Sequence, residues 1–243
     1  MSDHVDRNSN VKALLLPVGL DKQSAGAYGP IFEDGSFEYI PKPADNESAA
    51  HATYNKRLGR KRLPLAVYLP RTLKNAAIDE NPNFQAYQYN VDPSLWVFLR
   101  PLLRGDLLVF CAGLQPFHTD VYRTGLYIIG YFTAKDVIAF DDLAQVDEQR
   151  RSNQIVNGDA KSRDTPSVTL VVGDDEHSKL LDTAVPLANY VVNRDKKAGA
   201  KFSSSDEMVE FIGLPSTINN SDLPIWIVGQ EYIKNLKQLL GLL

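Results

Sequence analysis

Short apolar runs bounded by turn-forming residues recur along this chain and predict a protein built mainly of strands. Runs of four to eight apolar residues between Gly, Pro, Asn or Asp are typical of buried strands. The runs are residues 11–18, 96–99, 102–103, 107–114, 125–132, 137–140 and 168–172, and residues 65–69 fit a strand or a short helix. Gly130 interrupts one run, which predicts a bulge or a bend there.

Helical periodicity is clearest at the C-terminus. Within residues 230–243, apolar side chains at 3.6-residue spacing share one face, and these are Tyr232, Ile233, Leu236, Leu239, Leu240 and Leu243. Shorter helices are predicted at 143–151 and at 178–185, the latter stopped by Pro186, and residues 193–206 are predicted to form a loop. No helix of 10 to 15 residues separates the middle strands, which favours antiparallel or mixed pairing over a doubly wound parallel sheet.

The predicted fold is therefore α+β, with a central mixed or mostly antiparallel sheet capped by the C-terminal helix. Residues 1–10 are polar and predicted to be disordered, and residues 11–243 are expected to form one domain because no linker of distinctive composition interrupts them.

Composition narrows the class of protein. Of the 243 residues, 44% are hydrophobic and 23% are charged, which is typical of globular proteins. The single cysteine, Cys111, excludes an internal disulfide and a zinc site made of cysteines. There is no secretory signal and no run of about 20 apolar residues, so we expect a soluble, cytoplasmic protein with no membrane partner. The four histidines lack zinc-hydrolase spacing, no phosphate-binding glycine fingerprint is present, and no cofactor or metal is indicated.

A glycine-rich segment at residues 19–41 is the first candidate site. Glu33-Asp34-Gly35-Ser36 predicts a hairpin turn. Glycine permits close approach of a ligand to the backbone, and aromatic side chains can stack on a base. The carboxylates of Glu33, Asp34 and Glu38 are candidate acids or bases. The alternative is a plain hairpin with solvated turn carboxylates.

A basic segment is the second candidate. Residues 48–78 contain no acidic residue and carry a net charge of +7, although the whole chain has a net charge of −4. Five of these cations are candidate phosphate ligands: Lys56, Arg57, Arg60, Lys61 and Arg62. The alternative is an ordinary solvated surface. A third stretch, 171–180, places Asp174 where it is expected to cap the predicted helix.

Four blocks resemble the nucleotide modification associated domain family, specifically its third type. They are LLPVGLDKQSAGAYGPIFEDGSFEYIPKP, LLRGDLLVFCAGL, GLYIIGYFTAKDV and VVGDDEHSKLLDTAVPL, which together run from about residue 11 to 187. A weaker similarity, carried by the Gly-Asp-Leu-Leu-Val-Phe strand, is to PUA-like modules that read modified bases, which would make the sheet a partly closed barrel.

The resemblance implies ligand-binding positions residue by residue. In the first block these are Asp21, Lys22, Gly29, Pro30, Phe32, Glu33, Asp34, Gly35, Phe37, Glu38 and Tyr39, and in the later blocks they are Asp106, Asp174, Ser178 and Lys179. The family's genomic association implies DNA-modification or phage-defence systems, with DNA, a nucleotide or DNA-modification proteins as partners.

Three functions are compatible with these observations. In the first, the protein binds a nucleotide or a modified nucleic acid: the glycine-rich segment holds base and sugar, Phe37 or Tyr39 stacks, and the basic segment holds phosphate. In the second, it is an enzyme that uses the hairpin carboxylates on a nucleotide or modified base. In the third, it is a structural or interaction subunit.

Overall fold

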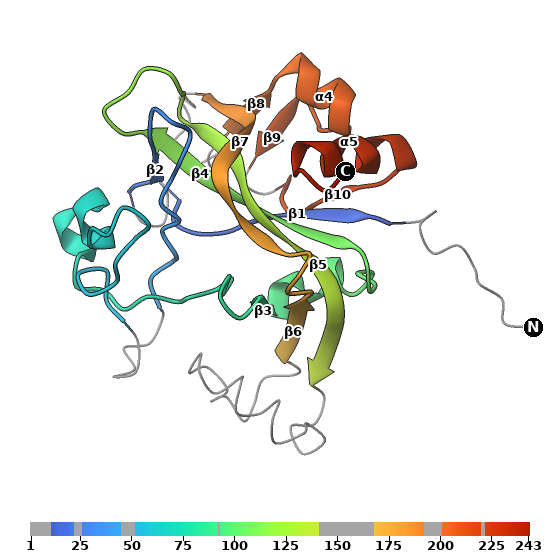
Figure 1. Cartoon of the computed structure of the whole chain (residues 1–243), viewed down its shortest axis with the longest axis horizontal. Coiled ribbons are helices and arrows are strands. Elements are labelled where there is room, and N and C mark those ends of the chain that lie inside the picture. Colours follow the sequence, from blue (N-terminus) through green and yellow to red (C-terminus); the bar gives the residue numbers. More distant parts are fainter. Residues whose placement is uncertain are drawn as a thin grey trace, which may run out of the picture.

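A curled, mixed β-sheet forms the centre of the protein (Figure 1). The computed structural model describes residues 11–21, 26–44, 52–91, 93–140, 168–191, 201–219 and 222–243. Within these ranges the sheet contains ten strands, with the main path β10-β1-β4-β5-β7-β8-β9 and with β2, β3 and β6 paired alongside it. The predicted α+β class and mixed sheet are confirmed, and the sheet curls into a half-barrel.

Strands β4 and β5 are two long neighbouring strands in the interior of this sheet. They span Leu107–Pro116 and Gly125–Phe140, and pair antiparallel. Both cover predicted strands, and β5 joins the two runs 125–132 and 137–140 into one. The register shifts between Ile128 and Gly130, which confirms the predicted bulge. The first half of β5 also pairs with β7, and its second half pairs with β6.

The N-terminal strands β1 and β2 lie one after the other along the same edge of β4. Strand β1 (Ala13–Pro17) runs parallel to β4 as far as Cys111, and β2 (Gly29–Ile31) resumes parallel pairing at Leu114. Among the described residues between them, none pairs with β4 as a strand, so Ala112 and Gly113 have no described strand beside them on this edge. This interruption positions the pocket described below.

The region after β6 differs from its prediction. Strand β6 (Val168–Gly173) is confirmed, but residues 178–185 belong to strand β7 (Lys179–Val191) and are not a helix. The strand continues through Pro186, opposite Tyr127, where the pairing register shifts. Pairing of β7 with β5 on one side and with β8 on the other determines its conformation, which local sequence does not encode.

Two further predictions are wrong in part. Residues 96–99 form the short helix α2 (Trp96–Leu99), because the turn η4 (Pro93–Leu95) immediately before it starts a helical path. All four of its residues are apolar, but Val97 is exposed and Leu99 is buried, so the helix does not bury all of its faces. Residues 201–204 form β8 (Lys201–Ser204) inside the predicted loop, because they pair with β7 and β9. The helix predicted at 143–151 lies outside the described residues.

The C-terminal helix is confirmed and shorter than predicted. Helix α5 spans Gln230–Leu239, and Ile233, Leu236 and Leu240 are buried in the main core. It packs beside α4 (Asp206–Ile212), whose N-cap is Ser205. In Figure 1 both helices lie beside the end of the sheet that carries β1 and β10. The remaining strands are β3 (Gln88–Val91), β9 (Thr217–Asn219) and β10 (Ile225–Ile227).

A second, smaller core holds the basic segment in place. Residues 52–78 contain the 3-10 helices η2 (Leu65–Tyr68) and η3 (Arg71–Leu73), the former being the short helix allowed for residues 65–69. The buried side chains of Tyr54 and Ile78 pack with Leu20 and Ile40 of the glycine-rich segment. The basic segment therefore packs against the glycine-rich segment and does not extend alone into solvent.

Candidate functional site

A pocket occupies the interruption between β1 and β2. Its volume is about 200 Å³. The chain that leaves the sheet after β1 forms one wall, and the sheet forms the other. The lining residues are Pro17, Val18, Gly19, Leu20, Asp21, Tyr28, Lys42, Cys111, Gly113, Leu126 and Phe202. The glycine-rich segment contributes residues 19–21 and Tyr28 to this lining, and its hairpin contributes none.

Tyr28 is the most unusual residue of this pocket. Its side chain is only 2% exposed, and its hydroxyl has no hydrogen-bond partner among the described residues. Burial, with smaller contributions from Tyr190 and Asp21, raises the pKa of Tyr28 to about 12, so that the phenol is neutral. Its ring lies directly on Gly113, where any side chain would collide with it. Buried polar groups without partners are rare and costly.

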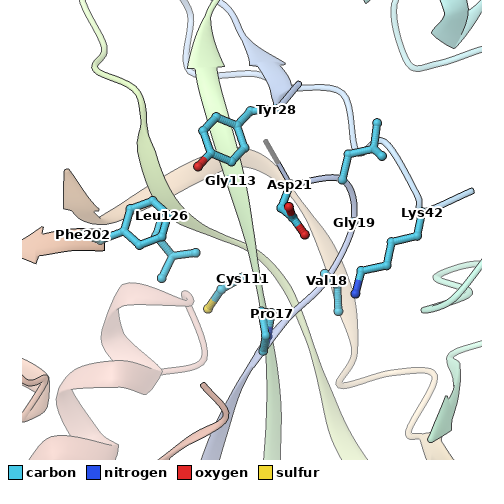
Figure 2. A pocket seen from close by; sticks show the side chains of 11 residues that line it. Pro17, Val18, Gly19, Asp21, Tyr28, Lys42, Cys111, Gly113, Leu126 and Phe202 are labelled. Atoms are coloured by element: carbon cyan, nitrogen blue, oxygen red, sulfur yellow. The ribbon is translucent and has the colours of Figure 1, made fainter. Parts of the chain in front are cut away.

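Charged and apolar side chains occupy opposite sides of the pocket. Figure 2 shows Asp21 and Lys42 extending from the loop wall, whereas Leu126 and Phe202 lie across from them on the sheet side. The Cys111 thiol lines the floor, and burial raises its pKa far above the ordinary range, so it is not a thiolate nucleophile. The site therefore combines an apolar interior with a charged mouth.

The predicted hairpin lies against the basic segment. The turn is present: Ile31 bridges Phe37, and the Phe32 amide donates to the Ser36 carbonyl. The predicted second arm, residues 37–40, forms only this bridge and no strand. Glu38 is 1% exposed, and its two carboxylate oxygens accept the backbone N–H groups of Arg60 and Lys61, each at 2.7 Å.

Ion pairs reinforce the same contact. The Arg60 guanidinium donates to the Leu181 carbonyl at 2.7 Å and pairs with Asp182 at 3.2 Å, while Lys61 pairs with Asp34 at 3.4 Å. Hydrogen bonds from Ser36, and then Lys61, lower the pKa of Asp34. Lys61 also lies 4.8 Å from the Phe32 ring centroid. Arg57 pairs with Glu80 at 3.3 Å, so three of the five predicted phosphate ligands are engaged within the protein.

Other cations of the basic segment make no ion pair or hydrogen bond through their side chains within the described part of the chain. Lys56 and Arg62 belong to the predicted set, while Arg71 and Lys74 follow it in sequence. All but the partly buried Lys74 are exposed. These four cations are the ones that the structure leaves available to an external anion.

The aromatic residues predicted to stack on a base are covered. Phe37 is 0% exposed, with the Arg60 guanidinium 5.3 Å from its centroid. Tyr39 donates its hydroxyl to the Asn81 carbonyl and packs edge-on against Phe84 at 5.8 Å. Phe32 packs edge-on against Tyr68 and Phe117. A base stacked on any of these rings would have to displace a present neighbour.

Residues expected from the later blocks make local structural contacts. Asp106 is buried and accepts the N–H groups of Lys12 and Leu103, both at 2.9 Å. Ser178 accepts the Thr133 N–H at 3.1 Å. Asp174 accepts the Glu176 and His177 amides in the β6–β7 turn and therefore caps no helix. Lys179 pairs with Asp182 at 2.8 Å, and its neighbours place it outside the pocket lining.

The structure also places the remaining candidates. Gly29 is buried in β2, where a Cβ would meet the Glu38 carbonyl at 2.7 Å, and Gly35 takes a φ of +78° in the turn. Glu33 is exposed, and Lys22 lies outside the described residues. Of all predicted site residues, the pocket lining contains Asp21 alone. None of the carboxylates proposed for catalysis lines it.

Comparison with protein families matches residues 12–208 to nucleotide modification associated domain 3. The chain belongs to this family. The match extends over all pocket residues, from Pro17 to Phe202, and over the whole basic segment, whereas α5 lies beyond it. No curated protein and no solved structure matches the chain. The family resemblance seen in the sequence is confirmed.

Neither a metal centre nor a membrane helix accompanies the family match. In the described ranges, no three His, Cys, Asp or Glu residues cluster to hold a metal ion. Nor do those ranges contain a helix with the length and apolarity that spanning a bilayer requires. Tyr28, Asp21 and Lys42 supply hydrogen-bonding groups and charge to the pocket lining.

Sequence reasoning passed over the pocket residues Tyr28, Lys42, Gly113, Leu126 and Phe202. Tyr28 and Lys42 lie inside the first family block, and the choice among the aromatic residues of that block was made without knowledge of burial. Gly113 lies at the end of an apolar run and could have been identified from the sequence, because a glycine in a strand often marks a place where a ligand or another part of the chain comes close. Nothing local indicates Phe202, which is 174 residues away from Tyr28 in the sequence and approaches through sheet pairing.

Proposed function

We propose that this protein binds nucleic acid beside the enzymes that modify it, and that the basic segment contacts the phosphates. The observation that carries the proposal is a set of four cations (Lys56, Arg62, Arg71 and Lys74) whose side chains make no ion pair with any described residue, on a segment without acidic residues. The family's association with nucleotide modification supports the choice of partner.

The fixed position of the basic segment makes it suited to this task. Glu38 holds the backbone of Arg60 and Lys61, and the second core holds Tyr54 and Ile78. A cation that is already positioned loses less conformational freedom on binding than one on a free chain. The segregated charge would also attract a polyanion despite the net charge of −4.

The test is DNA binding measured by fluorescence anisotropy over a range of salt concentrations. A variant with Gln at positions 56, 62, 71 and 74 should bind more weakly. The slope of log K against log salt should fall by up to about 4, since each phosphate contact contributes about 0.9 to this slope on duplex DNA.

A matched control removes the same charge elsewhere. Arg100, Arg104, Lys234 and Lys237 lie outside the basic segment and make no ion pair or side-chain hydrogen bond within the described ranges. Changing these four to Gln should leave the slope nearly unchanged. Equal loss in both variants would reduce the effect to net charge, and an unchanged slope in the first variant would refute the role of the basic segment.

A further inference from the structure

The buried hydroxyl of Tyr28 suggests that the pocket is a binding site. Folding usually pairs such a group, and this one is unpaired while its ring lines a cavity that has charged groups at its mouth. Figure 2 shows the hydroxyl of Tyr28, the residue immediately before β2, pointing toward Leu126 and Phe202. Gly113 leaves the room that the Tyr28 ring needs to reach this position.

Size and lining restrict the ligand. Pockets for drug-sized molecules occupy about 300–1,000 Å³, and this one has about 200 Å³. A single ring system fits this volume better than a whole dinucleotide does. The interior walls are apolar and include two aromatic rings, Tyr28 and Phe202, which suit a flat ring. The charges of Asp21 and Lys42 suit polar substituents at the mouth.

We propose that this pocket binds one nucleobase, whose edge forms a hydrogen bond with the Tyr28 hydroxyl. Asp21 is placed to accept from an amino group of the base, and Lys42 to meet the phosphate of the same nucleotide. The choice of a nucleobase rests on the proposed function. In a nucleic acid, the base would have to leave its stack to enter, as bases do in other proteins that read or modify single bases.

Binding requires a small rearrangement. The Tyr28 hydroxyl is covered in the free protein, so a side chain beside it, such as Phe202 or Leu126, must change rotamer as the base enters. Rotamer changes of this kind are common on binding. The neutral phenol can donate or accept, and its raised pKa of about 12 keeps it neutral over the pH range of an ordinary binding assay.

The experiment is calorimetric titration of the full chain with the four nucleoside 5′-monophosphates and their C5-methylated and C5-hydroxymethylated pyrimidine forms. At least one should bind, and Tyr28→Phe should weaken it by about tenfold, the effect of one hydrogen bond worth 1.4 kcal/mol. Tyr127→Phe is the matched control. Its hydroxyl donates to the Arg123 carbonyl, and its side chain alternates with that of Leu126 to the other face of β5.

Each outcome bears on one proposal. No binding of any mononucleotide at millimolar concentration, or equal affinity in wild type and Tyr28→Phe, would overturn the pocket as a base site. The variant lacking the four basic-segment cations should keep its mononucleotide affinity within about twofold while losing DNA affinity. If DNA binding depends on those cations and no mononucleotide binds, the pocket proposal fails and the proposed function stands. If a mononucleotide binds and DNA binding does not depend on those cations, the proposed function fails.

Discussion

The pocket and the contact between hairpin and basic segment use polar groups in opposite ways. At the contact, the Glu38 carboxylate accepts two backbone amides, and Arg60 and Lys61 are engaged by Asp182 and Asp34. In the pocket, the Tyr28 hydroxyl is just as buried and has no partner among the described residues. The contact is built from ion pairs and charged hydrogen bonds, whereas the pocket lining places Asp21, Lys42 and Tyr28 among apolar side chains.

This difference separates structural polar groups from binding groups. A buried carboxylate with both oxygens satisfied contributes to stability, and its removal leaves donors unpaired. A buried hydroxyl without a partner reduces the stability of the free protein, which is a frequent property of binding sites. Among the hairpin carboxylates, Glu38 has the geometry of a structural group, because both of its oxygens accept backbone amides.

The largest expected effect is at Glu38. Glu38→Ala leaves the amides of Arg60 and Lys61 without acceptors, so we expect the free energy of unfolding to fall by about 3 kcal/mol. Urea denaturation measures it. Glu33→Ala, at an exposed neighbour, should change stability by less than about 0.5 kcal/mol. A Glu38 variant of normal stability would remove the distinction between the two regions.

A second variant fills the space that Tyr28 uses. Gly113→Ala places a methyl group against the Tyr28 ring, and overpacking of this kind costs about 1–3 kcal/mol. In a Tyr28→Leu background the same change should cost less, so thermal unfolding of the four proteins should reveal a coupling between the sites. If the two substitutions have additive effects on stability, the packing of the Tyr28 ring does not depend on the absence of a side chain at Gly113.

Removing single hydroxyl groups compares the stability contributed by the Tyr28 hydroxyl with that contributed by a paired hydroxyl. Tyr28→Phe deletes an unpaired hydroxyl and should leave stability unchanged or raise it by about 1 kcal/mol. Tyr54→Phe deletes one that donates to the Pro41 carbonyl at 2.6 Å and should lower stability by about 1 kcal/mol. Chemical denaturation of both variants measures the two changes in the free energy of unfolding. A loss of stability in Tyr28→Phe as large as in Tyr54→Phe would mean that its hydroxyl is paired after all.

The smallest effect concerns acid stability. Hydrogen bonds from Ser36 lower the pKa of Asp34, and Lys179 followed by Arg60 lowers that of Asp182. Carboxylates with lowered pKa values stabilise the folded state above their unfolded pKa of about 3.9, and this contribution disappears as the pH falls through the folded value. The double variant Asp34→Asn, Asp182→Asn should therefore lose stability less steeply below about pH 4.

Unfolding transitions between neutral pH and pH 2 measure this difference. Because both carboxylates are exposed, their ion pairs are screened by salt, and 1 M salt should reduce the difference between variant and wild type. A pH profile identical to that of the wild type would show that these pairs contribute nothing to the contact.

Much of the fold was determined by local sequence. The apolar runs of β1, β4, β5 and β6, the bulge at Gly130 and the helix α5 were all predictable, because burial imposes a local periodicity on the residues that it covers. The turn at Glu33–Ser36 followed from its glycine and acidic residues. The uneven distribution of charge was visible without any structure.

Long-range pairing decided the rest. Residues 178–185 have no clear strand alternation, and pairing with β5 made them a strand. Arg60 meets Asp182 across 122 residues of sequence. The pocket exists because two successive strands pair with one edge of β4 and leave a space between them. A sequence pattern reports how deeply a residue is buried, and the partner that it meets there depends on which strands come together.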